Sequence, residues 1–74
     1  MNFEWHPTKA EANFQKHGVT FEEASTVFRD PFSTNFPDAD HSIEEERFII
    51  IGVSSLNRLL VVAHTERVNQ IRII

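Results

Sequence analysis

The amino-acid sequence predicts an α+β fold, in which two N-terminal helices pack on one face of a small antiparallel β-sheet. Helical patterns fill the first 30 residues, whereas short apolar runs rich in isoleucine and valine fill residues 47–74. Runs of this kind are too short for helices and are typical of buried strands. Because helices and strands occupy separate parts of the chain, the strands are expected to pair through hairpins.

The length and the cysteine content limit what the chain can be. With 74 residues it has room for one domain, residues 1–74, and without cysteine it has neither disulfides nor thiolate metal sites. A domain this small buries only about 60% of the surface of its unfolded chain, so a partner chain is an expected source of stability. No apolar run is long enough to span a membrane, and no signal peptide is evident. We therefore expect a cytoplasmic location.

The first helix is expected over residues 7–17. Pro7 suits a first helical turn, and Gly18 suits the left-handed residue that follows a helix. Ala10 and Phe14 are four residues apart and are expected to share its buried face.

The second helix has the clearest local signal in the sequence. Thr20 and Glu23 form a capping-box pattern, in which each side chain is expected to bond a free backbone N–H group of the other. Its core face is expected to consist of Phe21, Ala24 and Phe28, with Val27 beside them. The helix should end before Pro31, because a residue that precedes proline avoids helical geometry.

The remaining elements are expected to be strands and one long connection. Residues 31–46 are expected to form a mostly polar connection with Phe32 and Phe36 as apolar anchors. An alternating segment near the N-terminus and three later runs predict strands. These are Phe3–Trp5, Arg47–Ser54, Leu59–Thr65 and Gln70–Ile74.

The net charge of −4 is distributed unevenly along the chain. Residues 1–46 contain three basic and ten acidic residues, giving −7, whereas residues 47–74 contain four arginines and one glutamate, giving +3. Arginine suits bidentate phosphate contacts, so the second half can attract nucleic acid. The acidic half can attract a basic partner. The alternative is that the arginines are ordinary solvent-facing residues of the strands.

Histidine and arginine near the end of the second buried strand are the first candidates for chemistry. RNA cleavage without a metal needs a base for the 2′-hydroxyl, an acid for the leaving oxygen and cations for the phosphorus centre. His64, Arg67 and Arg72 can supply these roles if strand pairing gathers them. The alternative for His64 is a hydrogen-bonded histidine in the core.

Two other histidines have alternative explanations. His17 and Lys16 lie at a helix C-terminus, where the helix dipole favours cations without any function. His41 lies among Asp38, Asp40 and Glu45, a combination that can bind a divalent metal and would suit a metal-dependent hydrolase. The segment lacks a recognised ligand pattern, so we expect no metal there and no cofactor.

Ordered motifs run through nearly the whole chain, and their order and spacing together resemble the BrnT family of toxins. The matching stretches are Phe3-Glu4-Trp5 with Pro7 and Lys9, Asn13, Lys16-His17-Gly18-Val19, Phe21-Glu22-Glu23-Ala24, Val27-Phe28, Asp30-Pro31, Asp38, Asp40-His41, Glu45-Glu46-Arg47-Phe48, Ile51-Gly52, Ser54, Arg58-Leu59-Leu60-Val61-Val62, His64-Thr65-Glu66-Arg67 and Ile71-Arg72-Ile73-Ile74.

The resemblance implies a RelE-like fold and a ribosome-independent endoribonuclease that needs no cofactor. It also implies neutralisation by an antitoxin, BrnA, which binds DNA through a ribbon-helix-helix region, so contact with DNA is expected only through that partner. Within the matching motifs we assign candidate catalytic roles to His64, Arg67, Arg72, His41 and Glu45. We assign candidate RNA contacts to Lys16, His17, Arg47 and Arg58.

The sequence departs from the family pattern at two places. His6 stands where the family usually has an acidic residue, a better helix cap, so the first helix is expected to start less firmly. Family members also continue past Arg72-Ile73-Ile74 with Ser-Ala-Arg and a basic helix, so a C-terminally truncated domain is expected here. The alternative to a nuclease is then a catalytically impaired module that keeps antitoxin binding, or that self-associates through an exposed strand edge.

Overall fold

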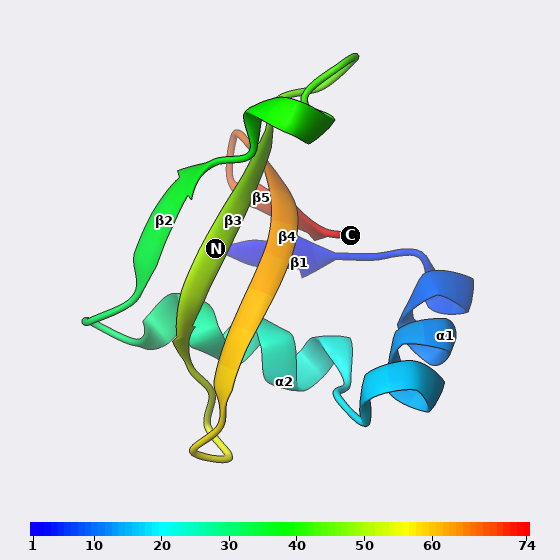
Figure 1. The fold of residues 1–74 in the computed structure, drawn as a ribbon, viewed down its shortest axis with the longest axis vertical. Coiled ribbons are helices and arrows are strands. Elements are labelled where there is room, and N and C mark those ends of the chain that lie inside the picture. Colours follow the sequence, from blue (N-terminus) through cyan, green and yellow to red (C-terminus); the bar gives the residue numbers. More distant parts are fainter.

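A computed structural model describes all residues, 1–74, and contains two α-helices, two short 3-10 turns and one five-stranded sheet (Figure 1). The prediction of an α+β fold is confirmed. The sheet has the strand order β1-β5-β4-β3-β2. The elements along the chain are β1 (Asn2–Glu4), α1 (Pro7–His17), α2 (Phe21–Thr26), η1 (Val27–Arg29), β2 (Thr34–Pro37), η2 (Ala39–His41), β3 (Arg47–Val53), β4 (Leu59–Arg67) and β5 (Gln70–Ile73).

The sheet is mixed, so the prediction of a purely antiparallel sheet is wrong. Strand β1 pairs in parallel with β5, with Phe3 opposite Ile71, whereas the other three pairings are antiparallel. No hairpin joins β1 to β5, so no turn imposes an antiparallel direction on them. The ring of Phe3 packs 5.2 Å from that of Phe28, which ties β1 to the core.

Strand β2 replaces part of the connection expected over residues 31–46. It pairs antiparallel to β3 at the sheet edge, with Phe36 opposite Ile49. Its last residue is Pro37, and an edge strand tolerates proline because no further neighbour needs its missing N–H group. Phe32 and Phe36 are both exposed, so neither residue anchors the core as expected.

Helix α2 and η1 cover one face of the sheet (Figure 1). Seven apolar residues from helix and strands form the buried core: Phe21, Ala24, Val27, Ile50, Val62, Ile71 and Ile73. Helix α1 has no buried residue, and of its side chains only Ala10 packs against the core. Phe14 is 45% exposed, so its expected place on a buried face is wrong. With so few apolar residues, α1 cannot form a continuous apolar stripe.

The caps of both helices agree only in part with those predicted from the sequence. Gly18 has the predicted left-handed conformation, with φ of 69°, and His6 caps α1 by accepting from the Thr8 N–H at 3.2 Å. Thr20 Oγ1 accepts from the Glu23 N–H at 3.0 Å, as predicted. The return bond of the capping box is not formed, because the Glu23 carboxylate points into the protein.

Buried Glu23 joins α2 to the β3–β4 hairpin. Its carboxylate accepts from Ser54 Oγ at 2.7 Å and from Arg58 Nε at 2.9 Å, and Arg58 Nη2 also bonds it. Arg58 further donates to the Gly18 carbonyl at 3.1 Å. The bonds from Arg58 lower the pKa of Glu23 despite its burial, and Ser54 adds to the effect.

Gly52 lies where β3 passes closest to η1 and the turn after it. A Cβ atom at this position would lie 2.9 Å from Ser33 Cβ and 2.9 Å from Val27 Cγ1. The Asp30 carboxylate also approaches here, because it accepts from the Val53 N–H at 2.8 Å. Only glycine fits this contact without displacing its neighbours.

Gly52→Ala is expected to destabilise the protein by about 1–3 kcal/mol, because its methyl group overpacks the contact with Val27. Urea unfolding followed by circular dichroism measures the change. Ser55→Ala, at an exposed position of the adjacent turn, is the control and should stay within about 0.5 kcal/mol of the parent. A Gly52→Ala protein as stable as this control would contradict the packing.

Stability is expected to decline on acidification, and Glu23 is expected to carry part of that decline. A carboxyl group whose pKa is lowered by folding stabilises the native state above its unfolded value of 4.5, and this stabilisation disappears as the pH falls through the folded pKa. Glu23→Gln should therefore flatten the pH dependence of the unfolding free energy between about pH 6 and 3.

Glu46→Gln is the matched control, because Glu46 is exposed and lies outside the ion pairs. Its acid profile should follow that of the parent. If Glu23→Gln keeps the full slope of the parent profile, the pairing with Arg58 contributes nothing to acid stability.

Candidate functional site

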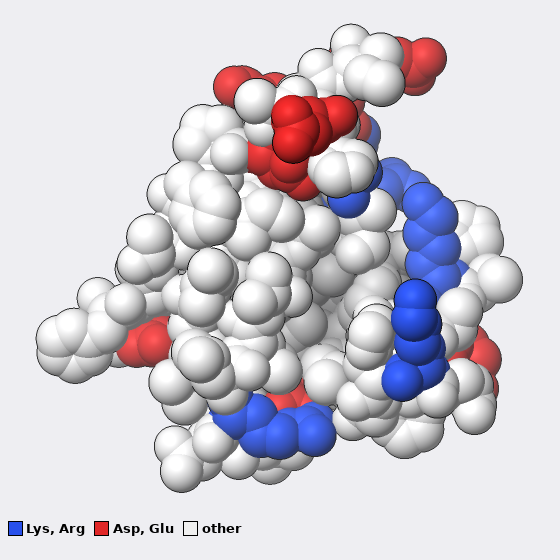
Figure 2. Space-filling view, viewed as in Figure 1, with Lys and Arg blue, Asp and Glu red and all other residues white.

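The sheet face turned away from α2 is mainly apolar, and polar side chains gather at one end of it. Figure 2 shows an uncharged surface over β2, β3 and β4, with acidic side chains near η2 and basic side chains on the side of α1. Arg47 of β3 stands opposite Thr65 of β4, and Thr65 stands opposite Arg72 of β5. Directly opposed residues share a face, so these three form a polar row across the strands.

A pocket of about 330 Å³ opens beside this row. Strand pairing supplies Arg47 and Thr65, η2 supplies His41, and the segment between η2 and β3 supplies the acidic wall. The lining residues are His41, Ile43, Glu44, Glu45, Arg47, Thr65 and Ile74. The structure thus brings together three of the predicted site residues, His41, Glu45 and Arg47.

Two polar atoms at this pocket are buried without a hydrogen-bond partner. They are Arg47 Nε and Thr65 Oγ1, and Thr65 as a whole is only 3% exposed. Arg47 takes part in none of the ion pairs of the protein. Buried polar atoms are costly when they lack a hydrogen bond, so water or a ligand that reaches this pair would stabilise it. A cationic donor beside a hydroxyl group suits an anion.

Arg72 of the row and the nearby Arg67 are held by carboxylates. Arg67 donates to Glu45 through Nε at 2.9 Å and Nη2 at 3.1 Å. Nη1 of Arg67 and Nη1 of Arg72 lie 3.4 Å and 3.2 Å from the same oxygen of Glu4. The Arg67 guanidinium lowers the pKa of Glu45 against the opposing effect of burial, and Arg72 contributes at longer range. Glu45 is therefore ionised near neutral pH and cannot serve there as a general acid.

His41 is positioned by a carboxylate of its own turn. Its Nδ1 atom lies 3.0 Å and 3.1 Å from the two oxygens of Asp38. Ser42 Oγ bonds the Asp38 carbonyl at 2.7 Å and accepts from the Arg47 N–H at 2.9 Å, so the turn is attached to the start of β3. An imidazole held at Nδ1 keeps Nε2 free to exchange protons.

His64 does not join the arginines. It is completely buried, with its ring 4.8 Å from that of Phe28 and 5.9 Å from that of Phe48. Its Nε2 atom lies 3.0 Å from Glu66 Oε2. The alternation of β4 turns His64 toward the core and Thr65 toward the opposite face. The expected cluster of His64 with Arg67 and Arg72 is therefore not formed, and the core alternative describes this residue.

Glu66 connects His64 to β2. Burial alone raises its pKa, but hydrogen bonds from Asn35 and His64 outweigh burial and lower the pKa. Asn35 Nδ2 donates to Glu66 at 2.8 Å. Glu66 thus links His64 of β4 to Asn35 of β2, on the face of the sheet opposite to the polar row.

The remaining candidate RNA contacts are divided between two places. Arg58 lies at the other end of β4 and is engaged by Glu23, so it does not belong to the polar row. Lys16 and His17 line a separate pocket of about 320 Å³ along α1. Ile74 lines both this pocket and the one at Arg47, so the two pockets are adjacent.

Sequence reasoning missed Thr65 and the role of Asp38. Thr65 has no chemistry that stands out in a list of motifs, but the alternation of β4 already placed its side chain on the face opposite to that of His64.

The four residues proposed for a metal do not form a metal site. The structure contains no group of three or more histidine, aspartate and glutamate side chains able to hold a metal ion. None of the helices is long and apolar enough to cross a membrane.

Comparison with known proteins identifies the family. The model of a family described as the ribonuclease toxin BrnT of type II toxin-antitoxin systems matches residues 5–74. No match was found among curated proteins. The match covers nearly all of the chain, including every residue of the polar row and its pocket. The chain belongs to the BrnT family of ribonuclease toxins.

Proposed function

We propose that this chain is a metal-independent endoribonuclease toxin that binds the scissile phosphate of RNA at Arg47 and Thr65 and is neutralised by a BrnA-like antitoxin. The observation that supports it best is the pair of buried polar atoms without a protein partner, Arg47 Nε and Thr65 Oγ1, whose residues line the pocket beside His41. A phosphate oxygen accepts hydrogen bonds from N–H and O–H donors, so in this proposal an RNA phosphate supplies the acceptor that both groups lack within the protein.

In this proposal Arg47 carries most of the phosphate binding. Its guanidinium has no competing carboxylate, unlike Arg67 and Arg72, which are held by Glu45 and Glu4. The phosphorus centre gains negative charge as the 2′-oxygen attacks, and fixed cations stabilise that charge. Arg67 and Arg72 add to this field from the side, already oriented by their carboxylates.

His41 is the proposed proton acceptor. As the O2′–P bond forms and the P–O5′ bond breaks, the neutral imidazole takes the proton of the 2′-hydroxyl, and the departing O5′ takes a proton from water. The products are a 2′,3′-cyclic phosphate and a 5′-hydroxyl end. Asp38 positions the ring and stabilises the imidazolium that forms.

Lys16 and His17 are proposed to bind RNA phosphates outside the cleaved step. They line the pocket that adjoins the Arg47 pocket at Ile74, so a single strand of RNA can pass from one to the other. His64 touches no RNA in this scheme. It supports β4 from inside, through Glu66, and so holds Thr65 on the opposite face.

Arg47→Ala is expected to reduce RNA cleavage by about 10²–10³-fold, because it removes the cation closest to the developing charge. Incubation of a fluorophore-labelled RNA with purified protein, followed by gel analysis, measures the rate. Arg29→Ala is the matched control, since Arg29 is exposed on η1 outside the pocket, and it should cleave like the parent.

The same assay tests metal independence and the alternative function. Excess chelator should leave the parent rate unchanged. A folded parent chain that binds a BrnA-like protein but leaves RNA intact would reject the nuclease and favour the impaired binding module instead.

Thr65→Val is expected to raise stability while lowering cleavage. Valine keeps the shape of threonine, and it removes a buried hydroxyl group that has no partner within the protein, an arrangement that costs about 1–3 kcal/mol. Loss of one hydrogen bond to phosphate should reduce cleavage about tenfold.

Thermal unfolding and the RNA assay on the same samples separate the two effects. Thr34→Val, an exposed substitution on edge strand β2, should change neither quantity. A Thr65→Val protein that loses stability would show that the hydroxyl has a structural partner, against the proposed phosphate site.

A further inference from the structure

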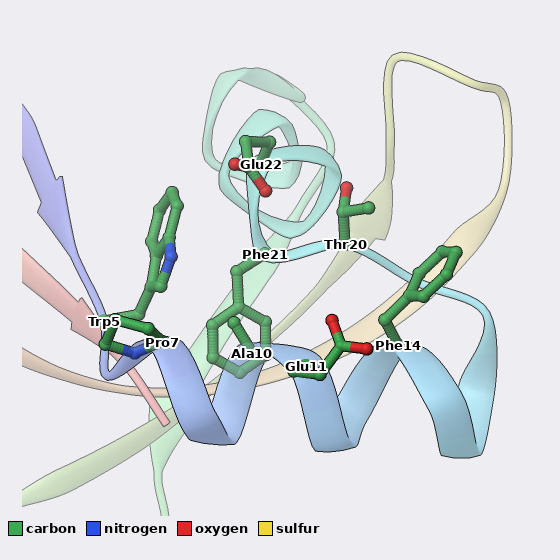
Figure 3. A pocket seen from close by; sticks show the side chains of 8 residues that line it. All are labelled: Trp5, Pro7, Ala10, Glu11, Phe14, Thr20, Phe21 and Glu22. Carbon is green, nitrogen blue, oxygen red and sulfur yellow. The ribbon is translucent and has the colours of Figure 1, made fainter.

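A second pocket, of about 310 Å³, lies between α1 and the start of α2 and has no part in the proposed function. It shares no lining residue with the pocket at Arg47. Figure 3 shows aromatic side chains at both ends and in the middle of it, with one carboxylate from each helix at its opening. We call it the interhelix pocket, defined by Trp5, Ala10, Glu11, Phe14, Phe21 and Glu22.

The apolar surface of the interhelix pocket packs against the core at one end and is exposed at the other. Trp5 packs against the core, with its ring 6.0 Å from that of buried Phe21 in an edge-to-face arrangement. Ala10 lies beside Phe21 on the α1 side (Figure 3). Phe14 leaves 45% of its surface in solvent although it faces this space. Exposed aromatic surface around a concavity is typical of a contact site.

The two carboxylates of the interhelix pocket are not neutralised. Neither Glu11 nor Glu22 takes part in any ion pair of the protein, whereas Glu4, Glu23, Glu45 and Glu66 all do. Glu11 accepts one neutral hydrogen bond, from Gln15 at 3.0 Å. No lysine, arginine or histidine lines the pocket. Its charge is therefore complementary to a cation.

We propose that the interhelix pocket receives an arginine side chain from a basic segment of a partner protein. Arginine buries an apolar stem while its head remains hydrated, which fits a pocket with apolar walls and carboxylates at the mouth. Its planar guanidinium stacks on aromatic rings, with tryptophan the best partner, and bonds carboxylates in pairs. Arginine and tryptophan are also the residues that most often dominate the energy of protein interfaces.

The charge of the interhelix pocket favours a basic protein over an RNA at this place. Its charged lining consists of two carboxylates without a cationic partner, so the pocket itself disfavours a phosphate. The arginine-rich half of the chain builds the polar row instead. The proposal does not depend on RNA cleavage, because the interhelix pocket shares no lining residue with the pocket at Arg47.

Trp5 provides a direct reporter, because it is the only tryptophan of the chain. Titration of the full chain with an acetylated, amidated Ala-Arg-Ala peptide at low salt should change its fluorescence in a saturable way. The same peptide with citrulline in place of arginine keeps the shape without the charge and should produce no saturable change.

The double variant Glu11→Gln/Glu22→Gln should bind the arginine peptide at least tenfold more weakly while keeping the melting temperature and the RNA cleavage of the parent. Asp40→Asn/Glu46→Gln changes the net charge equally at exposed positions away from the pocket and should bind like the parent. Phe14→Ala keeps the charge and should weaken binding by removing apolar contact.

Several results would overturn the proposal. Equal weakening in both double variants would reduce the effect to net charge, and binding of the citrulline peptide would remove the need for a cation. Absence of any fluorescence response would exclude an arginine contact at Trp5. Loss of RNA cleavage in the Glu11→Gln/Glu22→Gln protein would assign the pocket to the nuclease site. Self-association that depends on Glu11 and Glu22 would make the occupant a second copy of this chain.

Discussion

The pairing of β4 with β3 on one side and β5 on the other is the constraint on which the rest of the structure depends. It places Thr65 between Arg47 and Arg72, and it sends the preceding residue, His64, into the core. A shift of one residue in this register would exchange the two faces and bury cations in place of Ile71 and Ile73. The buried side chains of α2 therefore fix the polar row on the opposite face without touching it.

The carboxylates around the row orient Arg67 and Arg72 and leave Arg47 without an ion-pair partner. Glu4 and Glu45 hold Arg67 and Arg72 in fixed orientations, which reduces the entropy that a ligand must remove on binding. Arg47 is left with its Nε atom buried and unpaired, a state that a folded domain tolerates at a cost of stability. Such a local cost is typical of binding sites, where an interaction that is absent in the free protein is completed by the ligand.

The sequence predicted the helices and strands better than the way in which they pair and pack. Local signals such as Pro7, Thr20 and Gly18 set the helix boundaries correctly, because each acts within a few residues. The parallel pairing of β1 with β5 depends on contacts between the two ends of the chain, which no local pattern encodes. Likewise His64 and Arg67 are only three residues apart in the sequence, but the two-residue period of a strand turns their side chains to opposite faces. Motif matching therefore singled out Arg47, His41 and Glu45, which the structure places around one pocket, and it did not single out Thr65.

The two functional surfaces proposed here differ in how their charged side chains are paired within the protein. At the pocket beside the polar row, Glu45 is engaged by Arg67, whereas Arg47 has no carboxylate partner. In the interhelix pocket, Glu11 and Glu22 have no cationic partner and no basic side chain lines the space. Pairing inside the protein therefore decides which charge is left for a ligand, because a carboxylate already bonded to a guanidinium competes less for a second cation. One surface then offers an unpaired cation to a phosphate, and the other offers unpaired carboxylates to a basic protein.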